Sequence, residues 1–435
     1  MVGEWPQAFL GDVVENFDAR RSPCSKRERE KRQGPYPYYG ATGIMDYVDD
    51  FLFEGLHLLI AEDGSVESPD GKPFLQLVDG QFWVNNHAHV LRATNEDETR
   101  FIYYALSNIA IRPYMSGSVQ AKLNQANLNR IAISYPPNEK DRYAIAHILG
   151  TLDDKIELNR QMNHTLEAMA QTLFKSWFVD FDPVVVNALR AGNPVPEKFA
   201  QRAAHYRDNP DALRLPEDTL RQFPDRFQES ELGAIPEGWD VQSLDDIATF
   251  LNGLACQKYP AAPGEPSLPA IKIRELRQGI SRNTDRVTIH VPEKYILHDG
   301  DVLFSWSGSL LIDIWTQGKG VLNQHVFKVI SENHPKWFYF HWLDFHLLEF
   351  KRIAADKATT MGHIKRHHLA DAKVVVPDSD IMKLASYHVS PISNNKIENA
   401  IQARSLAKLR DTLLPKLISG ELRVPDAEKL LEDVS

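Results

Sequence analysis

The chain of 435 residues contains the same pattern twice, in the same order and roughly 240 residues apart. Residues 58–64, an apolar run that ends in glycine, return as residues 302–308. Residues 85–87, Asn-Asn-His, return as residues 323–325, Asn-Gln-His. A repeat of this length is a duplicated domain-sized unit, far longer than the repeat of a solenoid. Two diverged copies predict two similar tasks on two different targets.

The composition places the chain among ordinary globular proteins. Hydrophobic residues make up 43% and charged residues 25% of it, and this length favours two to four domains. No apolar run approaches the roughly 20 residues of a membrane span, and the first residues do not form a signal peptide. Cys24 and Cys256 stand at unmatched places of the two halves, so we expect neither a disulfide framework nor a metal site. A reducing cytoplasm fits this pattern.

Each half begins with short apolar runs that alternate with Gly, Pro and Asn, which is typical of strands and turns. We expect strands at 74–78, 84–91 and 131–133, answered in the second half by strands at 301–305, 326–330 and 373–376. Short helices are expected around 101–107 and 337–351. The predicted fold class is therefore α+β, with two similar domains built on mixed sheets.

A long helix is predicted after each of these domains. From Asp141 to Phe178 the apolar residues recur at steps of three and four, the seam of a coiled coil, although Asn159 and Asn163 interrupt it. A matching pattern ends at Gly420, and we expect Pro391 to kink or begin that second helix. The two helices are expected to pack antiparallel against each other. The alternative is that each folds back onto its own domain. The seam residues singled out are Leu152, Ile156, Met162, Leu166, Leu173, Trp177, Ile397, Ile401, Leu409 and Leu413.

The distribution of charge along the chain is more informative than the net charge. A net charge of −10 would argue against a nucleic-acid partner. However, basic side chains gather in three segments, at 20–32, 272–286 and 351–373, and acidic residues collect in the connector between the halves and in the C-terminal tail. Local patches govern contact with phosphates, so the total is compatible with either interpretation.

Four motifs in this order resemble one family. They lie at residues 36–41, 173–183, 232–239 and 413–422, and with the duplicated layout they resemble the specificity subunit of type I restriction–modification systems. The resemblance covers essentially the whole chain. It implies that residues 1–140 and 237–380 are two target recognition domains, each reading one half of a split DNA site. Residues 141–182 and 381–422 would be the proximal and distal spacer helices, with a semi-ordered connector at 183–236 and a tail at 423–435.

The resemblance also implies partners. The spacer helices would set the gap between the half-sites and dock two adenine-methyltransferase subunits, and restriction/translocase subunits would complete the complex on double-stranded DNA. This chain would be non-catalytic and bind no cofactor, with S-adenosylmethionine on the methyltransferase partners. The chain lacks both the Asn/Asp-Pro-Pro-aromatic motif and the Gly-rich loop that a methyltransferase would need.

The candidate DNA contacts are basic or amide side chains in the charged segments and in a loop before the last strand of each domain. Lys122 in this loop corresponds to His363. An ordinary solvated loop would give the same residues. We expect His87 and His325 to be structural. The full set is Arg20, Arg21, Lys26, Arg27, Arg29, Lys31, Arg32, Gln120, Lys122, Lys272, Arg274, Arg277, His363, Lys365 and Arg366.

Two other functions remain open at this point. Glu62, Asp63, Asp70 and Lys72 form a carboxylate cluster followed by Asp-x-Lys, which a metal-dependent nuclease could use. The second half has lost these acids. A helical assembly scaffold without DNA reading is the other alternative, and it predicts no basic loops matched between the halves.

Overall fold

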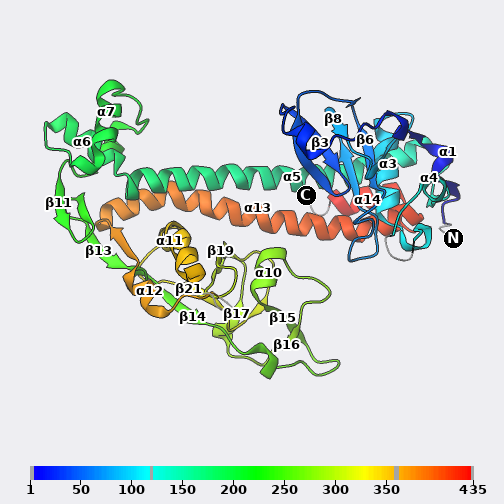
Figure 1. The fold of residues 1–435 in the computed structure, drawn as a ribbon. Coiled ribbons are helices and arrows are strands. Elements are labelled where there is room, and N and C mark those ends of the chain that lie inside the picture. The colour runs from blue at the N-terminus through cyan, green and yellow to red at the C-terminus, as the bar shows by residue number, and fades with distance from the viewer. Residues whose placement is uncertain (1–3, 118–120, 357–361, 433–435) are drawn as a thin grey trace. The chain divides into compact units, whose positions relative to one another are not determined.

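The computed structural model describes residues 4–117, 121–356 and 362–432. The chain divides into two units, residues 1–157 with 405–435 and residues 158–404 (Figure 1). The two long helices, α5 (Glu139–Phe174) and α13 (Ser379–Ser419), contribute to both units. Each unit therefore consists of the sheets of one half and parts of both helices.

The first unit holds ten strands and five short α-helices besides the long ones among its described residues. The strands are β1 (Gln7–Phe9), β2 (Glu15–Asn16), β3 (Tyr36–Gly40), β4 (Gly43–Val48), β5 (Phe53–Glu54), β6 (His57–Ala61), β7 (Leu75–Val78), β8 (Gln81–Val84), β9 (Ala88–Arg92) and β10 (Ala132–Ser134). The helices are α1 (Leu10–Val13), α2 (Lys26–Arg29), α3 (Glu96–Ser107) and α4 (Gln125–Asn129), and α14 (Val424–Glu432) follows α13.

The second unit repeats this content and adds the connector. The connector elements are α6 (Asp182–Ala191), α7 (Ala200–Asp208), α8 (Glu217–Leu220), β11 (Phe227–Ser230) and β12 (Gly233–Pro236). The recognition part contains β13 (Asp240–Ser243), α9 (Leu244–Ile247), β14 (Thr249–Asn252), β15 (Ser267–Ile271), α10 (Ile273–Gln278), β16 (Arg286–Thr288), β17 (Ile296–Leu297), β18 (Val302–Ser305), β19 (Leu311–Ile314), β20 (Gly320–Leu322), β21 (Val326–Ile330), α11 (Lys336–Asp356), α12 (Arg366–Asp371) and β22 (Lys373–Val376).

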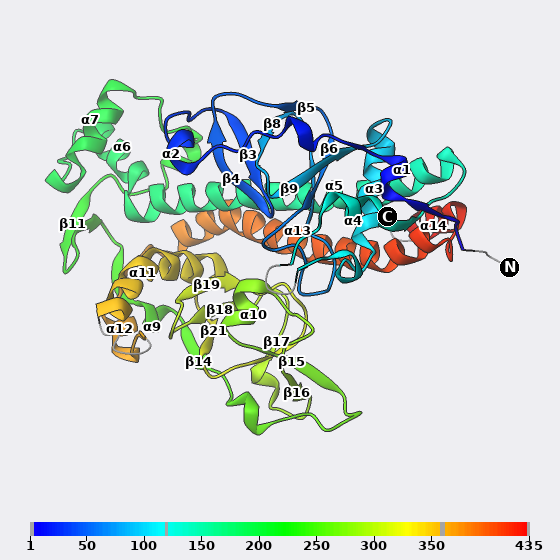
Figure 2. The ribbon, with the colours of Figure 1, turned by 45° about the vertical axis from the view of Figure 1, so that its right-hand side comes forward.

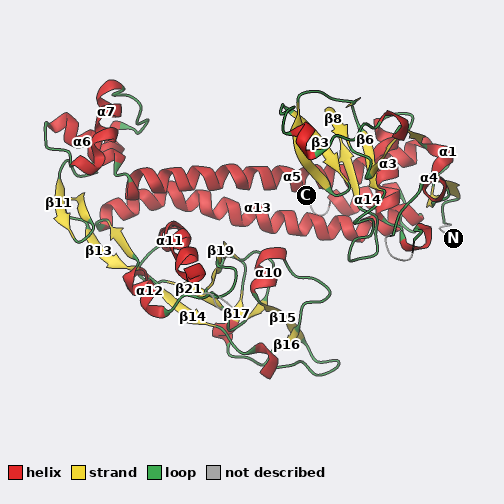
Figure 3. Cartoon of the chain, in the orientation of Figure 1, coloured by secondary structure: helices red, strands yellow, loops and turns green. Residues whose placement is uncertain are grey.

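Both units combine helices with strands (Figure 3). They share one sheet topology, which confirms the duplication. The order β2-β9-β6-β7 in the first unit matches β14-β21-β18-β19 in the second, and β4-β3-β8-β5 matches β16-β15-β20-β17. Both of the latter sheets are mixed, because β3 pairs parallel with β8 and β15 pairs parallel with β20. The predicted α+β class with mixed sheets is confirmed.

Helix α11 covers one sheet of the second unit (Figure 2). Its Phe350 lies 6.0 Å from the ring centre of Phe304 in β18, and both side chains are buried. Aromatic contacts of this kind add to the burial of apolar area that stabilises the core.

The core of each unit includes a helix end from the other half of the sequence. In the first unit, Leu413 and Leu417 of α13 are buried with Leu10 and Ile145. In the second unit, Trp177 and Phe178, in the π-helical segment Lys175–Val179 that directly follows α5, are buried in the same cluster as Trp239 and Trp337. Neither domain therefore completes its hydrophobic core from its own half alone.

A tryptophan at the start of each half makes this connection. Trp5 donates from its ring nitrogen to the Leu417 carbonyl at 2.9 Å, and Arg423 lies 3.7 Å from its ring centre. The ring also lies against Gly420, whose φ of +85° ends α13 as the sequence predicts. Trp239, the matching residue of the second half, packs against Phe178 with ring centres 5.8 Å apart.

The long helices pair antiparallel within each unit, as predicted. In the second unit, Asn159 donates to Gln402 at 2.9 Å and Asn163 donates to the Lys396 carbonyl at 2.9 Å. In the first unit, Arg410 and Asp153 form an ion pair 2.5 Å apart. The asparagines that interrupt the seam are thus polar contacts between the helices, and such contacts fix the register of a helix pair.

Of the two roles expected for Pro391, to kink or to begin the second helix, the second is wrong. Helix α13 begins at Ser379, where the Asp378 carboxylate accepts the backbone N–H groups of Asp380 at 2.9 Å and Ile381 at 3.0 Å. This cap satisfies donors that a helix start leaves open. The helix continues past Pro391, which is exposed and costs one backbone hydrogen bond in its interior.

Two further expectations are corrected. The strand expected at 84–91 is two strands, because β8 ends at Val84 and β9 begins at Ala88, with a turn between them. The connector is not semi-ordered. It folds into α6, α7 and α8, and its Phe199 and Phe223 are buried in the core of the second unit. Among the described residues, no helix is long and apolar enough to cross a lipid bilayer.

Candidate nucleic-acid interface

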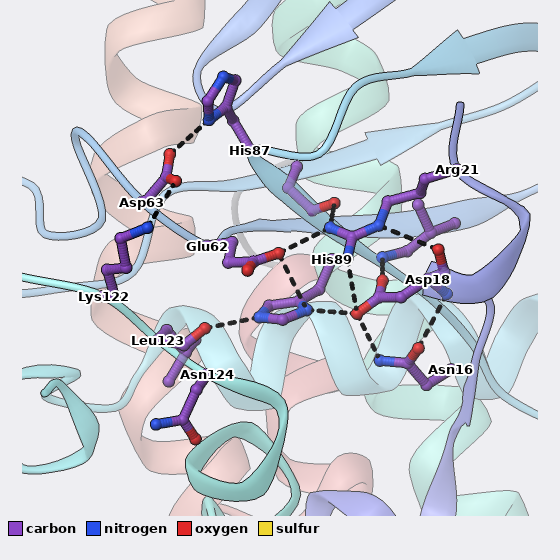
Figure 4. A network of polar contacts seen from close by, with 12 residues as sticks. Asn16, Asp18, Arg21, Glu62, Asp63, His87, His89, Lys122, Leu123 and Asn124 are labelled. Atoms are coloured by element: carbon purple, nitrogen blue, oxygen red, sulfur yellow. Dashed lines mark hydrogen bonds and ion pairs between the residues drawn. The ribbon is translucent and has the colours of Figure 1, made fainter. Parts of the chain in front are cut away.

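Three loops meet at one end of the sheets in the first unit (Figure 4). They follow β6 at residues 62–63, join β8 to β9 at 85–87, and precede α4 at 121–124. The Leu123 N–H donates to the Glu62 carbonyl at 2.8 Å, and the Glu62 N–H donates to the His87 carbonyl at 2.8 Å. Backbone hydrogen bonds therefore hold the three loops together, and we call them the first loop cluster.

The second unit repeats this arrangement. The Ile364 N–H donates to the Trp306 carbonyl at 3.0 Å, and Ser307 forms a β-bridge with His363. These contacts give His363 the place that Lys122 has in the first unit, so their predicted correspondence is confirmed. Residues 306–307, 323–325 and 362–365 form the second loop cluster.

The turn between the two strands is held by asparagine and not by histidine. Asn85 accepts the His87 N–H at 2.8 Å, and Asn323 accepts the His325 N–H at 3.3 Å. Both asparagines are buried. The side chain of His87 is 49% exposed, so its ring lies at the surface. The structural role that the sequence predicts for His87 is therefore filled by Asn85, two residues earlier.

The polar side chains of the two clusters differ in chemistry, with exposed rings of His87 and His325 beside a half-buried Asp63 in one and a buried Ser307 in the other. In the first, Asp63 bridges His87 Nδ1 at 2.6 Å and Lys122 Nζ at 3.4 Å. In the second, Ser307 Oγ lies 3.2 Å from His325 Nδ1. The same backbone therefore presents an acidic group between two basic ones in one unit and a hydroxyl beside a histidine in the other.

Beneath the first cluster lies a network of four charged side chains. Arg21 Nη1 lies 2.7 Å from Glu62 Oε2, and its other terminal nitrogen lies 3.4 Å from Asp18. His89 Nδ1 lies 2.5 Å from Asp18 Oδ2 and 3.8 Å from Glu62. Two cations thus balance two carboxylates, which is the condition for keeping charges out of water.

His89 is held as the imidazolium. Its Nε2 lies 2.6 Å from the Leu123 carbonyl and its Nδ1 faces the Asp18 carboxylate, so both ring nitrogens must donate. Burial alone would lower the pKa of His89. The hydrogen bonds to Asp18 and Leu123 and the charges of both carboxylates outweigh it and raise the pKa above 6.5. Asp18 is affected in the opposite sense: burial raises its pKa, but the bonds from His89 and Val90 hold it below 3.8.

The same cluster has the residue types of a cation site. Ligand atoms of Asp18, Glu62 and His89 lie within 4.8 Å of one another among the described residues. The Arg21 guanidinium already supplies the positive charge between these carboxylates, and both His89 nitrogens face acceptors. The geometry therefore fits an ion-pair network, and the expectation that the chain holds no metal stays a prediction.

The second unit replaces this network by a different set of side chains. Strand pairing sets Asn252 opposite Phe327, the places that Asp18 and His89 have in the first unit, and Trp306 stands where Glu62 does. Trp306 donates to Asn252 Oδ1 at 3.3 Å and its ring centre lies 6.0 Å from that of Phe327. The second loop cluster thus rests on an aromatic pair.

The basic residues at 20–32 separate into two groups. Arg20 donates to the Leu52 carbonyl at 2.7 Å, Arg29 lies 3.1 Å from Asp46, and Arg32 lies 2.9 Å from Asp49. With Arg21 in the network, these four have structural contacts. Arg20 is exposed despite its hydrogen bond, and Lys26, Arg27 and Lys31 extend into solvent on and after α2.

The basic candidates of the second unit also divide. Lys272 forms an ion pair with Asp285, and Arg274 lies 2.7 Å from the buried Glu275. Arg277 reaches Ser309 at 3.3 Å and lines a hollow of about 540 Å³ beside Gly308, close to the second loop cluster. His363, Lys365 and Arg366 are exposed. Gln120 lies outside the described residues.

The seam candidates serve packing more than docking. Leu152, Ile156, Trp177 and Leu413 are buried. Leu173, Ile397, Ile401 and Leu409 are half-buried, whereas Met162 is 41% exposed. Met162 and Leu166 line a groove of about 580 Å³ on the helix pair of the second unit, together with Leu158, Gln161, Thr165, Asn395 and Asn399.

The residues of the nuclease alternative are engaged separately. Lys72 Nζ donates to the Asn108 carbonyl at 2.7 Å, while Glu62 binds Arg21 and Asp63 binds His87 and Lys122. These contacts do not assemble a two-metal site with an adjacent lysine.

Comparison with known proteins shows the family. The model of the type I restriction modification DNA specificity domain matches residues 3–168 and 236–404, once in each half of the chain. The chain belongs to this family. It is a specificity subunit that recognises DNA in a sequence-specific manner and has no catalytic function of its own.

Several relatives extend this finding. The chain is 26% identical over 313 residues to the HindI specificity subunit of Haemophilus influenzae, a match that covers 66% of this chain and 68% of the relative. It is 25% identical over 347 residues to the MjaIX specificity subunit of Methanocaldococcus jannaschii, covering 75% and 70%. The crystal structure of a type I S subunit from M. genitalium shares the fold, with a TM-score of 0.59 and 14% identity over 95% of this chain and 96% of that one.

Sequence reasoning missed Asp18, His89 and Trp306. A position-by-position comparison of residues 58–64 with 302–308, and of 85–89 with 323–327, would have shown Glu62 opposite Trp306 and His89 opposite Phe327. A polar residue at a buried strand end needs a hydrogen-bonding partner when the matching residue of the other half is aromatic. This difference between the halves is the sequence signal that points to the network.

We expect Arg21→Ala to destabilise the first unit by about 3 kcal/mol, because two carboxylates would lose one of their two cations in a largely buried place. Lys26→Ala, an equally large loss of charge on an exposed side chain, should cost less than about 0.5 kcal/mol. Hydrogen exchange of the slowest amides of β6 and β9 measures both changes. Equal effects of the two substitutions would contradict the division into structural and exposed residues.

Proposed function

We propose that this chain recognises a bipartite site on double-stranded DNA, with each recognition domain reading one half-site. The single observation that carries the proposal is the repeated loop cluster. Two domains with one topology present their loops at the same place with different side chains, as expected of two readers of different sequences. A scaffold without DNA readout gives no reason for matched basic loops.

The charges on these surfaces support contact with DNA. Exposed Lys26, Arg27, Lys31 and Lys122 in the first unit are available for phosphates, and Lys365 and Arg366 have this role in the second. Phosphate contacts position a protein, while hydrogen bonds to base edges specify the sequence. The exposed rings of His87 and His325, held beside Asp63 in one cluster and beside the buried Ser307 in the other, are suited to base edges because an imidazole can donate and accept hydrogen bonds.

The helix pair is proposed to set the spacer between the half-sites. Polar contacts such as those of Asn159 and Asn163 allow one antiparallel register, so the helices act as a defined length and not as a flexible linker. Each helical residue adds about 1.5 Å along the axis.

The groove around Met162 is the proposed contact for a methyltransferase subunit. It combines exposed apolar side chains with Gln161, Thr165 and two asparagines, the mixture of an apolar centre and a polar rim that protein interfaces show. The duplicated helices support two methyltransferase subunits per chain. S-adenosylmethionine would then be bound by those subunits, restriction/translocase subunits would join the same complex, and the complex would act in the cytoplasm.

Exchange of residues 1–140 for the same segment of a relative with another specificity should change one half-site and leave the other intact, because each loop cluster lies within its own unit. Methylation-sensitive sequencing of DNA from cells that carry the chimaera gives both half-sites directly. The matched control exchanges residues 237–380 and should change the other half-site. A chimaera that alters both half-sites would contradict two independent readers.

A seven-residue helical insertion in both long helices, after Glu157 and after Arg404, should lengthen the spacer by about three base pairs. Seven residues add about 10.5 Å and keep the phase of the seam, and the rise of DNA is about 3.4 Å per base pair. The sites lie between the contacts Asp153–Arg410 and Asn159–Gln402, so both are retained. Methylation-sensitive sequencing measures the length of the spacer in the recognised site. An unchanged spacer in an active complex would show that the helices do not set it, and insertion in one helix alone should abolish activity.

Met162→Asp should weaken binding of the methyltransferase subunits by at least tenfold, because a carboxylate would be desolvated in an apolar groove. Met169, on the same helix, is 48% exposed and does not line the groove, so Met169→Asp is the matched control. Co-purification and mass measurement of the complex give the result, with one specificity chain and two methyltransferase chains expected for the unchanged protein. Similar losses for both variants would exclude the groove as the specific contact.

A further inference from the structure

The buried histidine of the first unit lies directly below the loop that carries Lys122. His89 is 1% exposed, and its Nε2 donates to the carbonyl of Leu123, the residue after Lys122. The backbone N–H of the same Leu123 donates to the Glu62 carbonyl at 2.8 Å. The N–H and the carbonyl of Leu123 thus attach the loop to the charged network. The hydrogen bond at the carbonyl comes from the His89 ring, which can lose a proton.

We propose that the imidazolium of His89 is the positioning group of this loop: with both nitrogens protonated it holds residues 121–124 against the sheet, and loss of one proton releases them and weakens DNA contact by the first domain. This inference rests on the proposed function, because it assigns to His89 the positioning of a DNA-contacting loop.

The release follows from hydrogen-bond chemistry. A neutral imidazole has one N–H, and the carboxylate at 2.5 Å from Nδ1 is the stronger acceptor. Nε2 would then turn a lone pair toward the Leu123 carbonyl at 2.6 Å, where two acceptors repel each other. The loop can avoid this repulsion by moving away from the ring, since a buried acceptor without a donor is costly.

The charged groups around the ring define the pH range. Asp18 from the turn after β2, Arg21 beyond it and Glu62 after β6 face the network, and the Asp63–Lys122 pair lies at the surface of the loop cluster. The pKa of His89 is raised above 6.5, so the loop is held below 6.5 and is released as the pH rises through the raised value. The pKa of Asp18 is lowered below 3.8, so its carboxylate stays charged through this range.

The second domain provides an internal control. Phe327 takes the place of His89, and Trp306 and Asn252 take those of Glu62 and Asp18. The Ile364 N–H still donates to the Trp306 carbonyl at 3.0 Å, which matches the bond of Leu123. This loop is attached by the same backbone bond, and Phe327 gives it no imidazolium in the place of His89. The buried His368 ring of α12 accepts the Lys365 N–H at 3.0 Å, a role that a neutral ring fills, so the attachment should not weaken as the pH rises through this range.

Hydrogen exchange of the full-length chain between pH 6.5 and 9.5 tests the attachment, with rates divided by the intrinsic rate at each pH. Protection of residues 121–128 should fall at least tenfold over this range. Residues 362–369 and the α3 segment 96–107 should change less than twofold, the latter showing that the first unit stays folded. Constant protection of residues 121–128 in the unchanged protein would overturn the proposal, and this comparison needs no variant.

Substitution of the histidine separates a proton-dependent role from simple packing. In His89→Gln, protection of residues 121–128 should be low at both pH values, with a ratio below twofold. His147, an exposed histidine on α5, provides the control His147→Gln, which should behave like the unchanged protein. A pH response that persists in His89→Gln would overturn the assignment to this ring.

DNA binding is measured separately, with the assembled methyltransferase complex and a duplex that carries the site found by methylation sequencing. Affinity of the unchanged complex should fall about tenfold more between pH 6.5 and 9.5 than that of the His89→Gln complex. Equal changes in both complexes, with the loop still responding to pH, would overturn the link between loop and DNA. A complex that binds no DNA at any pH while the loop responds normally would instead overturn the proposed function.

Discussion

The fold depends on the packing of each domain onto a helix end that comes from the other half of the sequence. Trp5 and Leu10 of the first half pack with the end of α13, and Trp239 of the second half packs on the end of α5. Because each helix end completes a core, neither domain completes its core from its own half of the sequence. The buried Trp177 and Phe178 lie in the π-helical segment Lys175–Val179 that directly follows α5.

This arrangement leaves the opposite ends of the sheets free to diverge. The two loop clusters share their backbone hydrogen bonds, so the positions of residues 62, 123, 306 and 364 are set by the strands and not by the side chains. The support below them differs, with an ion-pair network of Asp18, Arg21, Glu62 and His89 in one unit and Trp306 with Phe327 in the other. A scaffold fixed by backbone bonds can accept such changes, which is what a family of proteins with many specificities requires.

The basic side chains likewise fall into a structural group and an exposed group. Arginines at 20–32 that lie near carboxylates or aromatic rings, such as Arg29 over Tyr38, stabilise the domain, whereas Lys26 and Arg27 extend into water. A count of basic residues treats the two groups alike. The charges of the paired arginines are offset by their carboxylates, so the exposed group carries most of the local positive charge. We propose that this local density allows a chain of net charge −10 to contact a phosphate backbone.

The sequence by itself determined the duplication, the α+β class, the long helices and the family, because these depend on periodicity and on motifs along the chain. It also determined the end of α13 at Gly420, since a glycine's freedom to adopt positive φ is a local property. Only the tertiary structure decided that the connector is ordered, that α13 passes through Pro391, and that Asn85 rather than His87 holds its turn. It alone decided that both ring nitrogens of His89 face acceptors, because its partners Asp18 and Leu123 stand far from it in the sequence. Burial and hydrogen bonding are set by residues that the fold brings together, and no local pattern contains them.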